Sequence, residues 1–298
     1  MSKHPLLPVV TIALTIAVAA CSGGAASSTP GASPADASAD PTPSDAIVHP
    51  TGPDEVVLRF DEVGGFVPME WIAARLPVFT LYGDGRVVFV QVMAEVPQRE
   101  DGLVAGAPVR TAQLSEDQVQ ELLRYALTDG GLAIAKTEYT NQLVADAPTA
   151  VFTINVENDS KTVSAYGLGI ESEPNADTVV LNRLAALADR LRDFDQGGSL
   201  ASQPYVAEAY RGVLIEQQGG VGAPVRDWPW TTITPADFAL PADPNALPSG
   251  TRTLTPDEVA AVGVDGYENG ITNGIWLRAD DGRVYSLVIR PLLPDEDA

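Results

Sequence analysis

The sequence predicts an α+β fold, in which hairpins build a mainly antiparallel sheet and two or three helices cover one face of it. Strand-like segments occur in pairs joined by tight turns rich in Asp, Asn and Gly. Helix-like segments with capping sequences lie between these pairs. A long alternation of single strands and helices, typical of doubly wound nucleotide-binding folds, is missing from the sequence.

The first 20 residues have the organisation of a signal peptide. Lys3 supplies a positive start, and the mainly apolar residues 5–20 end directly before Cys21, the only cysteine of the chain. Small polar residues follow, instead of the basic residues that flank a retained membrane span. We therefore expect the leader, residues 1–20, to be removed by cleavage before Cys21.

The segment Val18-Ala19-Ala20-Cys21 resembles the lipobox of bacterial lipoproteins. The resemblance implies that Cys21 becomes the mature N-terminus, and that acyl chains attached there hold the protein on the extracytoplasmic face of the cell membrane. An ordinary secretory peptide with a chance cysteine is the alternative. Because the chain has no second cysteine, an internal disulfide is excluded.

Residues 21–50 are expected to form a lipidated, disordered tether. The segment consists almost entirely of Ser, Gly, Ala, Thr, Pro and Asp and has no Phe, Trp or Tyr, so it cannot bury enough apolar surface to fold. Random-coil scaling gives it a mean reach of about 30 Å.

Strands are expected at residues 56–60 and in three hairpins, which occupy residues 79–90, 151–166 and 275–289. Each hairpin contains Asp or Asn in its turn, where these residues and Gly tolerate the backbone angles of a tight reversal. The Gly167-Leu168-Gly169 segment lacks the third glycine of a dinucleotide-binding loop and is interpreted as the end of a strand.

Two helix starts are predicted by the same capping-box pattern. Ser115 pairs with Gln118 at the first, and Thr255 pairs with Glu258 at the second. The longest helix is expected at residues 177–194, where one face carries Val180, Leu184, Leu187 and Leu191.

The folded part is expected to comprise an α+β domain at residues 51–196 and a second α+β part at residues 199–298. The stretch Gly197-Gly198-Ser199 is the most favourable place for a boundary, because such a segment is flexible. The second part either stands alone or shares the sheet of the first.

Acidic side chains outnumber basic ones by 40 to 18, which gives a formal net charge of −22. This excess disfavours nucleic-acid partners, which need a basic surface, and it disfavours direct adsorption to anionic lipid. We therefore expect membrane contact only through the acyl chains on Cys21. The acidic excess is interpreted as a solvated surface, and binding of cations or of a basic partner is the alternative.

The expected folded part contains neither histidine nor cysteine, because His4 lies in the leader and His49 in the tether. This excludes Ser-His-Asp and Cys-His catalysis and zinc sites built on those ligands, so no cofactor and no metal site is predicted. Two carboxylates can still form a glycosidase-type pair, which needs neither histidine nor metal. The sequence does not give the distance between carboxylates, so it does not show which two would form the pair. Asp84, Asp280 and Asp281 lie in predicted turns and are assigned backbone roles.

The aromatic residues Trp228 and Trp230, with Tyr205 and Tyr210 upstream, are the best candidates for a recognition surface. Their rings combine a large rigid area with a polar group, which suits stacking on sugars or on Pro-rich peptides. The alternative is that these rings pack an irregular, Pro-rich segment onto the core.

Three strings look like those of an uncharacterised family of secreted lipoproteins from actinobacteria and related high-GC bacteria. They are GGFVP at residues 64–68, PVFTLYGDGRV at 77–87 and RPLLPDE at 290–296. The resemblance implies an extracytoplasmic α+β lipoprotein and brings no catalytic residue. We expect a non-catalytic module that binds an envelope protein, peptide or glycan. The alternative is a carboxylate-dependent hydrolase of envelope polysaccharide, and a third reading is a structural subunit of an envelope complex.

Overall fold

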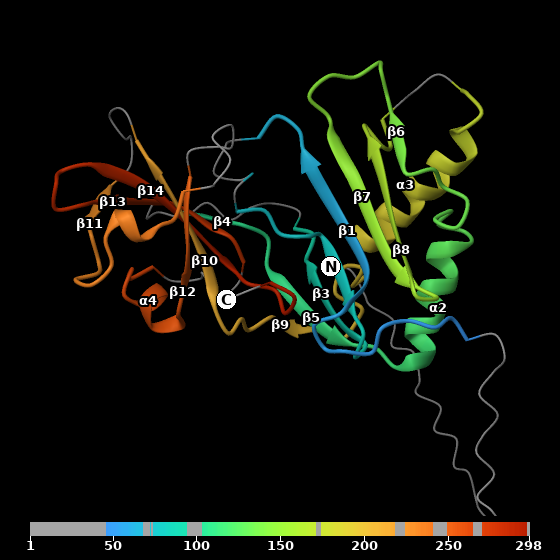
Figure 1. Cartoon of the computed structure of the whole chain (residues 1–298), viewed down its shortest axis with the longest axis horizontal. Helices are drawn as coiled ribbons and strands as arrows, with labels where there is room; N and C mark the ends of the chain where they lie inside the picture. The colour runs from blue at the N-terminus through green and yellow to red at the C-terminus, as the bar shows by residue number, and fades with distance from the viewer. Residues whose placement is uncertain are drawn as a thin grey trace, which may run out of the picture. The chain divides into compact units, whose positions relative to one another are not determined.

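The computed structural model describes most of the chain that follows the expected leader and tether. The described residues are 46–67, 72, 74–93, 103–170, 174–217, 224–240, 249–264 and 270–296. Cys21 and the predicted leader lie outside them. Asp45–Ala298 form one compact unit, whose elements are labelled in Figure 1. None of the helices in the described ranges is long and apolar enough to cross a membrane.

Eight strands form the first sheet, in the order β6-β8-β7-β1-β2-β3-β5-β9. Neighbouring strands are antiparallel except for the parallel pair β6 and β8. In chain order, these strands are β1 (Val56–Gly64), β2 (Phe79–Tyr82), β3 (Arg86–Val90), β5 (Val109–Gln113), β6 (Glu138–Thr140), β7 (Pro148–Val156), β8 (Asp159–Tyr166) and β9 (Gln203–Pro204).

Two helices, α2 (Glu116–Leu127) and α3 (Thr178–Arg192), cover one face of the first sheet (Figure 1). Alternate residues of the strands are buried beneath them, as the two-residue period of a strand requires. Phe60 of β1, for example, stacks on Phe152 of β7 with ring centroids 4.9 Å apart, and both rings are fully buried. This face is therefore one continuous apolar core.

Six strands form the second sheet. Five follow the order β11-β13-β14-β10-β12, and a sixth, β4, pairs with β13. The 3-10 turn η1 (Pro235–Asp237) lies before β12 (Gly250–Leu254) in the chain, and the short helix α4 (Pro256–Ala260) directly follows β12. The strands are β4 (Val104–Ala105), β10 (Tyr210–Glu216), β11 (Val225–Asp227), β12 (Gly250–Leu254), β13 (Thr272–Arg278) and β14 (Val284–Pro291).

The predicted α+β class, with mainly antiparallel pairing, is confirmed, and the strands divide into two sheets. The three predicted hairpins are β2–β3, β7–β8 and β13–β14. In the second of these, Glu157 and Asn158 form the turn with φ of 52° and 60°. Both capping boxes are present, at Ser115 and at Thr255. The helix expected at 177–194 is α3, and it buries Leu184, Leu187 and Leu191.

The two sheets exchange short strands. β9 follows the predicted boundary at residues 197–199, yet it pairs with β5 of the first sheet. β4 precedes that boundary, yet it pairs with β13 of the second sheet. One hydrophobic cluster also contains residues from both sheets, including Tyr82, Val88, Leu254 and Leu287. The two halves of the folded chain therefore share a core as well as strands.

The ordered chain begins before the expected end of the tether. The side chain of Gln120 bonds both backbone groups of Ile47, each at 2.8 Å, and the Glu157 N–H donates to Val48 O at 2.8 Å. His49 has a side chain only 6% exposed, and its Nε2 lies 3.2 Å from Glu116 Oε1. Residues 46–50 thus belong to the folded unit, and the folded unit does contain a histidine.

Candidate functional site

Trp228 and Trp230 lie against the second sheet and α4. The two rings meet edge to face with centroids 5.2 Å apart. The Trp228 Nε1–H donates to Ile233 O at 2.6 Å, and the Trp230 Nε1–H donates to Glu258 O at 2.8 Å. Trp230 is only 8% exposed, while Trp228 is partly buried. Both polar groups are therefore satisfied inside the protein, and the ring area left for a partner is small.

Tyr205 and Tyr210 are buried in the same hydrophobic cluster as the two tryptophans. The Tyr205 hydroxyl donates to Leu292 O at 2.8 Å, and burial raises the pKa of Tyr205 to about 12. The structure thus brings all four predicted aromatic residues together, but in a core. This arrangement corresponds to the packing role that the sequence left as the alternative.

A charged cluster lies on the face of β1 that points away from α2 and α3. We call it the Arg59 cluster, and it consists of Arg59, Asp61, Tyr82 and Asp295. Arg59 Nη2 and the Tyr82 hydroxyl both donate to Asp295 Oδ1, each at 2.7 Å. Arg59 Nε also donates to the Thr80 hydroxyl at 3.2 Å. These bonds join the C-terminal segment to two strands in the middle of the first sheet.

The two carboxyl groups of the Arg59 cluster shift their pKa values in opposite directions. Burial raises the pKa of Asp61, and the positive charges of Arg59 and Arg75 offset this only in part. Burial also acts on Asp295, but the hydrogen bonds from Arg59 and Tyr82 outweigh it and lower the pKa of Asp295. Burial and the bond to Asp295 raise the pKa of Tyr82, so its hydroxyl stays a donor. Within one cluster, the surroundings thus make ionisation less favourable for Asp61 and more favourable for Asp295 than for a free carboxyl group.

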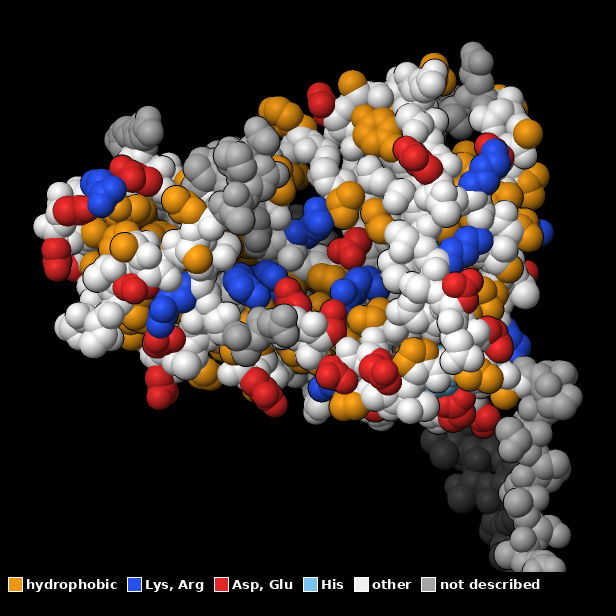
Figure 2. Space-filling model, viewed as in Figure 1, with side chains coloured by type: hydrophobic (Ala, Val, Ile, Leu, Met, Phe, Trp, Pro, Cys, Tyr) orange, Lys and Arg blue, Asp and Glu red, His pale blue; other side chains and the backbone are white. Residues whose placement is uncertain are grey.

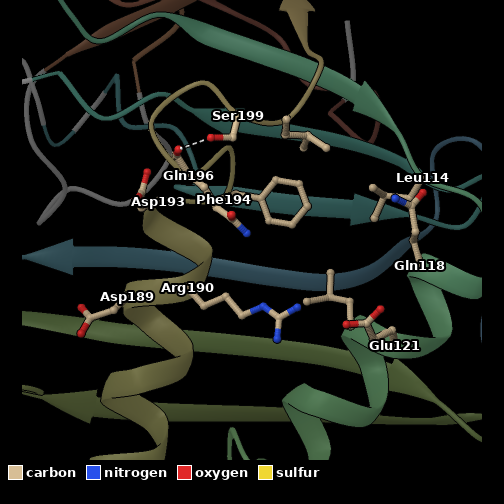
Figure 3. A pocket seen from close by; sticks show the side chains of 11 residues that line it. Leu114, Gln118, Glu121, Asp189, Arg190, Asp193, Phe194, Gln196 and Ser199 are labelled. Carbon is tan, nitrogen blue, oxygen red and sulfur yellow. Dashed lines mark hydrogen bonds between the residues drawn. The ribbon is translucent and has the colours of Figure 1, made fainter. Parts of the chain in front are cut away.

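A groove of about 470 Å³ lies between α2 and the end of α3 (Figure 3). Leu122 and Phe194 contribute apolar lining. Arg190 extends from α3 towards Glu121 of α2 (Figure 3). Its guanidinium carbon lies 4.1 Å from the ring centroid of Tyr125. Further carboxylates line the groove at Asp189 and Asp193. The groove is strongly charged and suits a ligand that carries charges of its own.

A second cavity, of about 510 Å³, has a different lining. It lies among the ends of β6 and β8, the loop that follows β6 and the first turns of α3. We call it the amide cavity. Its lining residues within the described ranges are 139–143, 166–170, Asn175, Thr178, Leu181, Asn182 and Ala185. None of these residues has a charged side chain. Neither Asp61 nor Asp295 lines this cavity or the groove.

The sequence pointed to none of these three sites. Asp295 is 236 residues from Arg59, so no motif spacing can connect them. The one local sign of the amide cavity was Gly167-Leu168-Gly169, which was interpreted as a strand end and does follow β8 directly. In the described ranges, no group of three or more His, Cys, Asp or Glu residues is placed to hold a metal ion.

Comparison with protein-family models, with curated proteins and with solved structures gives no match to this chain.

Proposed function

We propose that this chain is a lipoprotein held on the extracytoplasmic face of the cell membrane through acyl chains on Cys21. We also propose that its folded unit is a non-catalytic module that binds a protein, peptide or glycan of the cell envelope. The observation that carries the proposal is the sequence of the predicted leader, residues 1–20, whose last residues Val18-Ala19-Ala20 directly precede the only cysteine of the chain. Residues 22–45 then separate that cysteine from the first described residue, Ala46.

The folded unit supports a binding role through its concave surfaces. The groove and the amide cavity have volumes of about 470 and 510 Å³, within the range of small-ligand sites. Helical side chains contribute to the lining of both sites, with Glu121 and Arg190 in the groove and Asn182 in the amide cavity. Helices hold recognition groups more rigidly than loops do.

Replacing Cys21 tests the anchor. Cells that express the wild-type chain, Cys21→Ser or the matched control Ser22→Ala are labelled with a palmitate analogue and then fractionated. We expect label and membrane association in the wild type and in Ser22→Ala, and loss of both in Cys21→Ser. An unlabelled wild-type chain, or a Cys21→Ser chain that stays in the membrane fraction, contradicts the proposal.

A carboxylate-dependent hydrolase of envelope polysaccharide is the second candidate, and the Arg59 cluster favours it. Glycoside hydrolysis uses one carboxyl group with a raised pKa and a second that is ionised. The pKa of Asp61 is raised and that of Asp295 is lowered, which is the same pair of directions. The test is release of reducing ends from purified peptidoglycan. Release by the wild type that is abolished in Asp61→Asn favours the hydrolase, and no release by the wild type leaves the binding proposal in place.

A further inference from the structure

The lining of the amide cavity differs in charge from the rest of the protein. The chain has a formal net charge of −22, and Figure 2 shows Asp and Glu side chains spread over the face that it draws. The groove between α2 and α3 follows this pattern, with Glu121, Asp189 and Asp193 beside Arg190. Among the residues that the structure describes, the lining of the amide cavity includes no charged side chain. This described lining offers no counter-charge to an ionic ligand, so it favours a neutral one.

Three of the polar side chains that line this cavity, two amides and one hydroxyl, are open to a ligand. Gln142, Asn182 and Thr140 are exposed, and their side chains make no hydrogen bond to other described residues. An amide offers both donors and an acceptor, and a hydroxyl offers one donor and two acceptor positions. Sugar hydroxyls likewise act as donors and acceptors at once, so these three side chains match them.

Hydrogen bonds and close packing within the protein form one wall of the cavity. The Ala147 N–H donates to the Tyr166 hydroxyl at 3.2 Å, and that hydroxyl donates to Val144 O at 3.3 Å, so Tyr166 holds the loop that follows β6. Gly167 has a φ of 66°, and a Cβ there would lie 2.8 Å from Val144 Cγ2. Glycine permits both this backbone angle and this close approach, so the end of β8 packs directly on the loop that follows β6.

Apolar side chains complete the lining. Leu143 is 65% exposed and Ile170 is 43% exposed, and both line the cavity. The C–H faces of a sugar ring pack on such surfaces while the ring hydroxyls bond to polar neighbours. The combination of apolar patches with neutral amides and hydroxyls therefore fits a carbohydrate.

We propose that the amide cavity is a binding site for a neutral saccharide. This inference names the ligand class of the binding function proposed above. It depends on the binding role and not on the lipid anchor, because it concerns only residues of the folded unit.

The test measures binding of two neutral sugars, the trimer of N-acetylglucosamine and mannotriose, to the purified full chain in detergent by saturation-transfer NMR and calorimetry. Trigalacturonate, an anionic sugar, and Ala-Ala-Ala are the comparison probes. We expect at least one neutral trimer to bind and trigalacturonate not to bind. Gln142→Ala and Asn182→Ala should each weaken binding by about two- to tenfold, because each removes hydrogen bonds to the sugar.

Gln203→Ala is the matched control, since it removes an exposed amide of β9 outside the cavity. It should leave the affinity unchanged. The inference is overturned if neither neutral trimer binds to folded protein, if the double variant of Gln142 and Asn182 binds as the wild type does, or if Ala-Ala-Ala binds in their place. If the protein binds the sugar but the Cys21 labelling test fails, the proposed lipid anchor is contradicted and the proposed saccharide site stands.

Discussion

Trp230 makes the contacts of a core residue, although it occupies a Pro-rich segment without regular structure. Its ring is 8% exposed and its indole N–H is bonded to Glu258 O. We expect Trp230→Ala to lower the free energy of unfolding by about 3–5 kcal/mol, as loss of a large buried ring does. Trp228→Ala should cost less, because part of that ring is exposed. Urea denaturation measures both, and equal stability of Trp230→Ala and wild type would contradict this packing.

Asp295 makes stability depend on pH. Its folded pKa is lowered from the ordinary value of 3.8, so its contribution is present above the unfolded pKa and is lost as the pH falls through the folded pKa. We expect Asp295→Asn to cost about 1–3 kcal/mol at neutral pH, through weaker bonds with Arg59 and Tyr82. The difference from wild type should shrink below about pH 4.

Asp61 provides a control of opposite sign for that measurement. Its folded pKa is raised, so its ionised form is the less favourable one in the folded state. Asp61→Asn is therefore expected to stabilise the protein at neutral pH and to have little effect in acid. Denaturation curves at several pH values compare the two variants. A stability loss in Asp61→Asn that matches Asp295→Asn would show that both carboxylates act as ion-pair partners.

Single residues of note could be identified from the sequence, but the distant segments that pack against them could not. Trp228 and Trp230 were predicted to form a recognition surface, yet whether a ring faces solvent depends on α4 and η1, which come later in the chain. His49 was assigned to the tether because it lies in a segment made almost entirely of Ser, Gly, Ala, Thr, Pro and Asp. Its partner Glu116 is 67 residues away, and such a contact has no local signature.

At the level of elements, the capping boxes offer a direct test. The Ser115 hydroxyl accepts a bond from the Gln118 N–H at 3.4 Å, while the Gln118 side chain accepts from the Ser115 N–H at 2.9 Å. We expect Ser115→Ala to reduce the unfolding free energy by about 1 kcal/mol, and Thr255→Ala to have a similar effect at α4. Ser160→Ala, at an exposed position of β8, is the control. Stability that is unchanged in Ser115→Ala would argue against the cap.

Hairpins and helices were predictable because their determinants are local. Turn residues, capping boxes and the apolar stripe of α3 all lie within the element that they specify. The division into two sheets was not predictable for the opposite reason. β4 and β9 are two residues each, too short for any periodicity, and both join a sheet built mainly from the other half of the chain.

At the scale of the whole molecule, residues 46–50 act as part of the fold. We expect a fragment that starts at Ala46 to unfold cooperatively and to be more stable by about 1–3 kcal/mol than one that starts at Thr51, because the shorter fragment leaves Gln120 without its two bonds to Ile47. Thermal and urea denaturation measure the difference. Equal stabilities would mean that this segment is only loosely attached, and a melting temperature that drops in chelator would reveal a metal site.

The exchange of β4 and β9 also bears on what happens when the chain is cut. Gly197 and Gly198 are exposed, and neither contributes a strand to a sheet, so a protease can sever the backbone there. The first product keeps β4 and the second keeps β9, and each of these strands pairs with the other product. A nicked molecule should therefore remain one particle in solution, and the two products expressed separately should find each other and restore the fold by complementation.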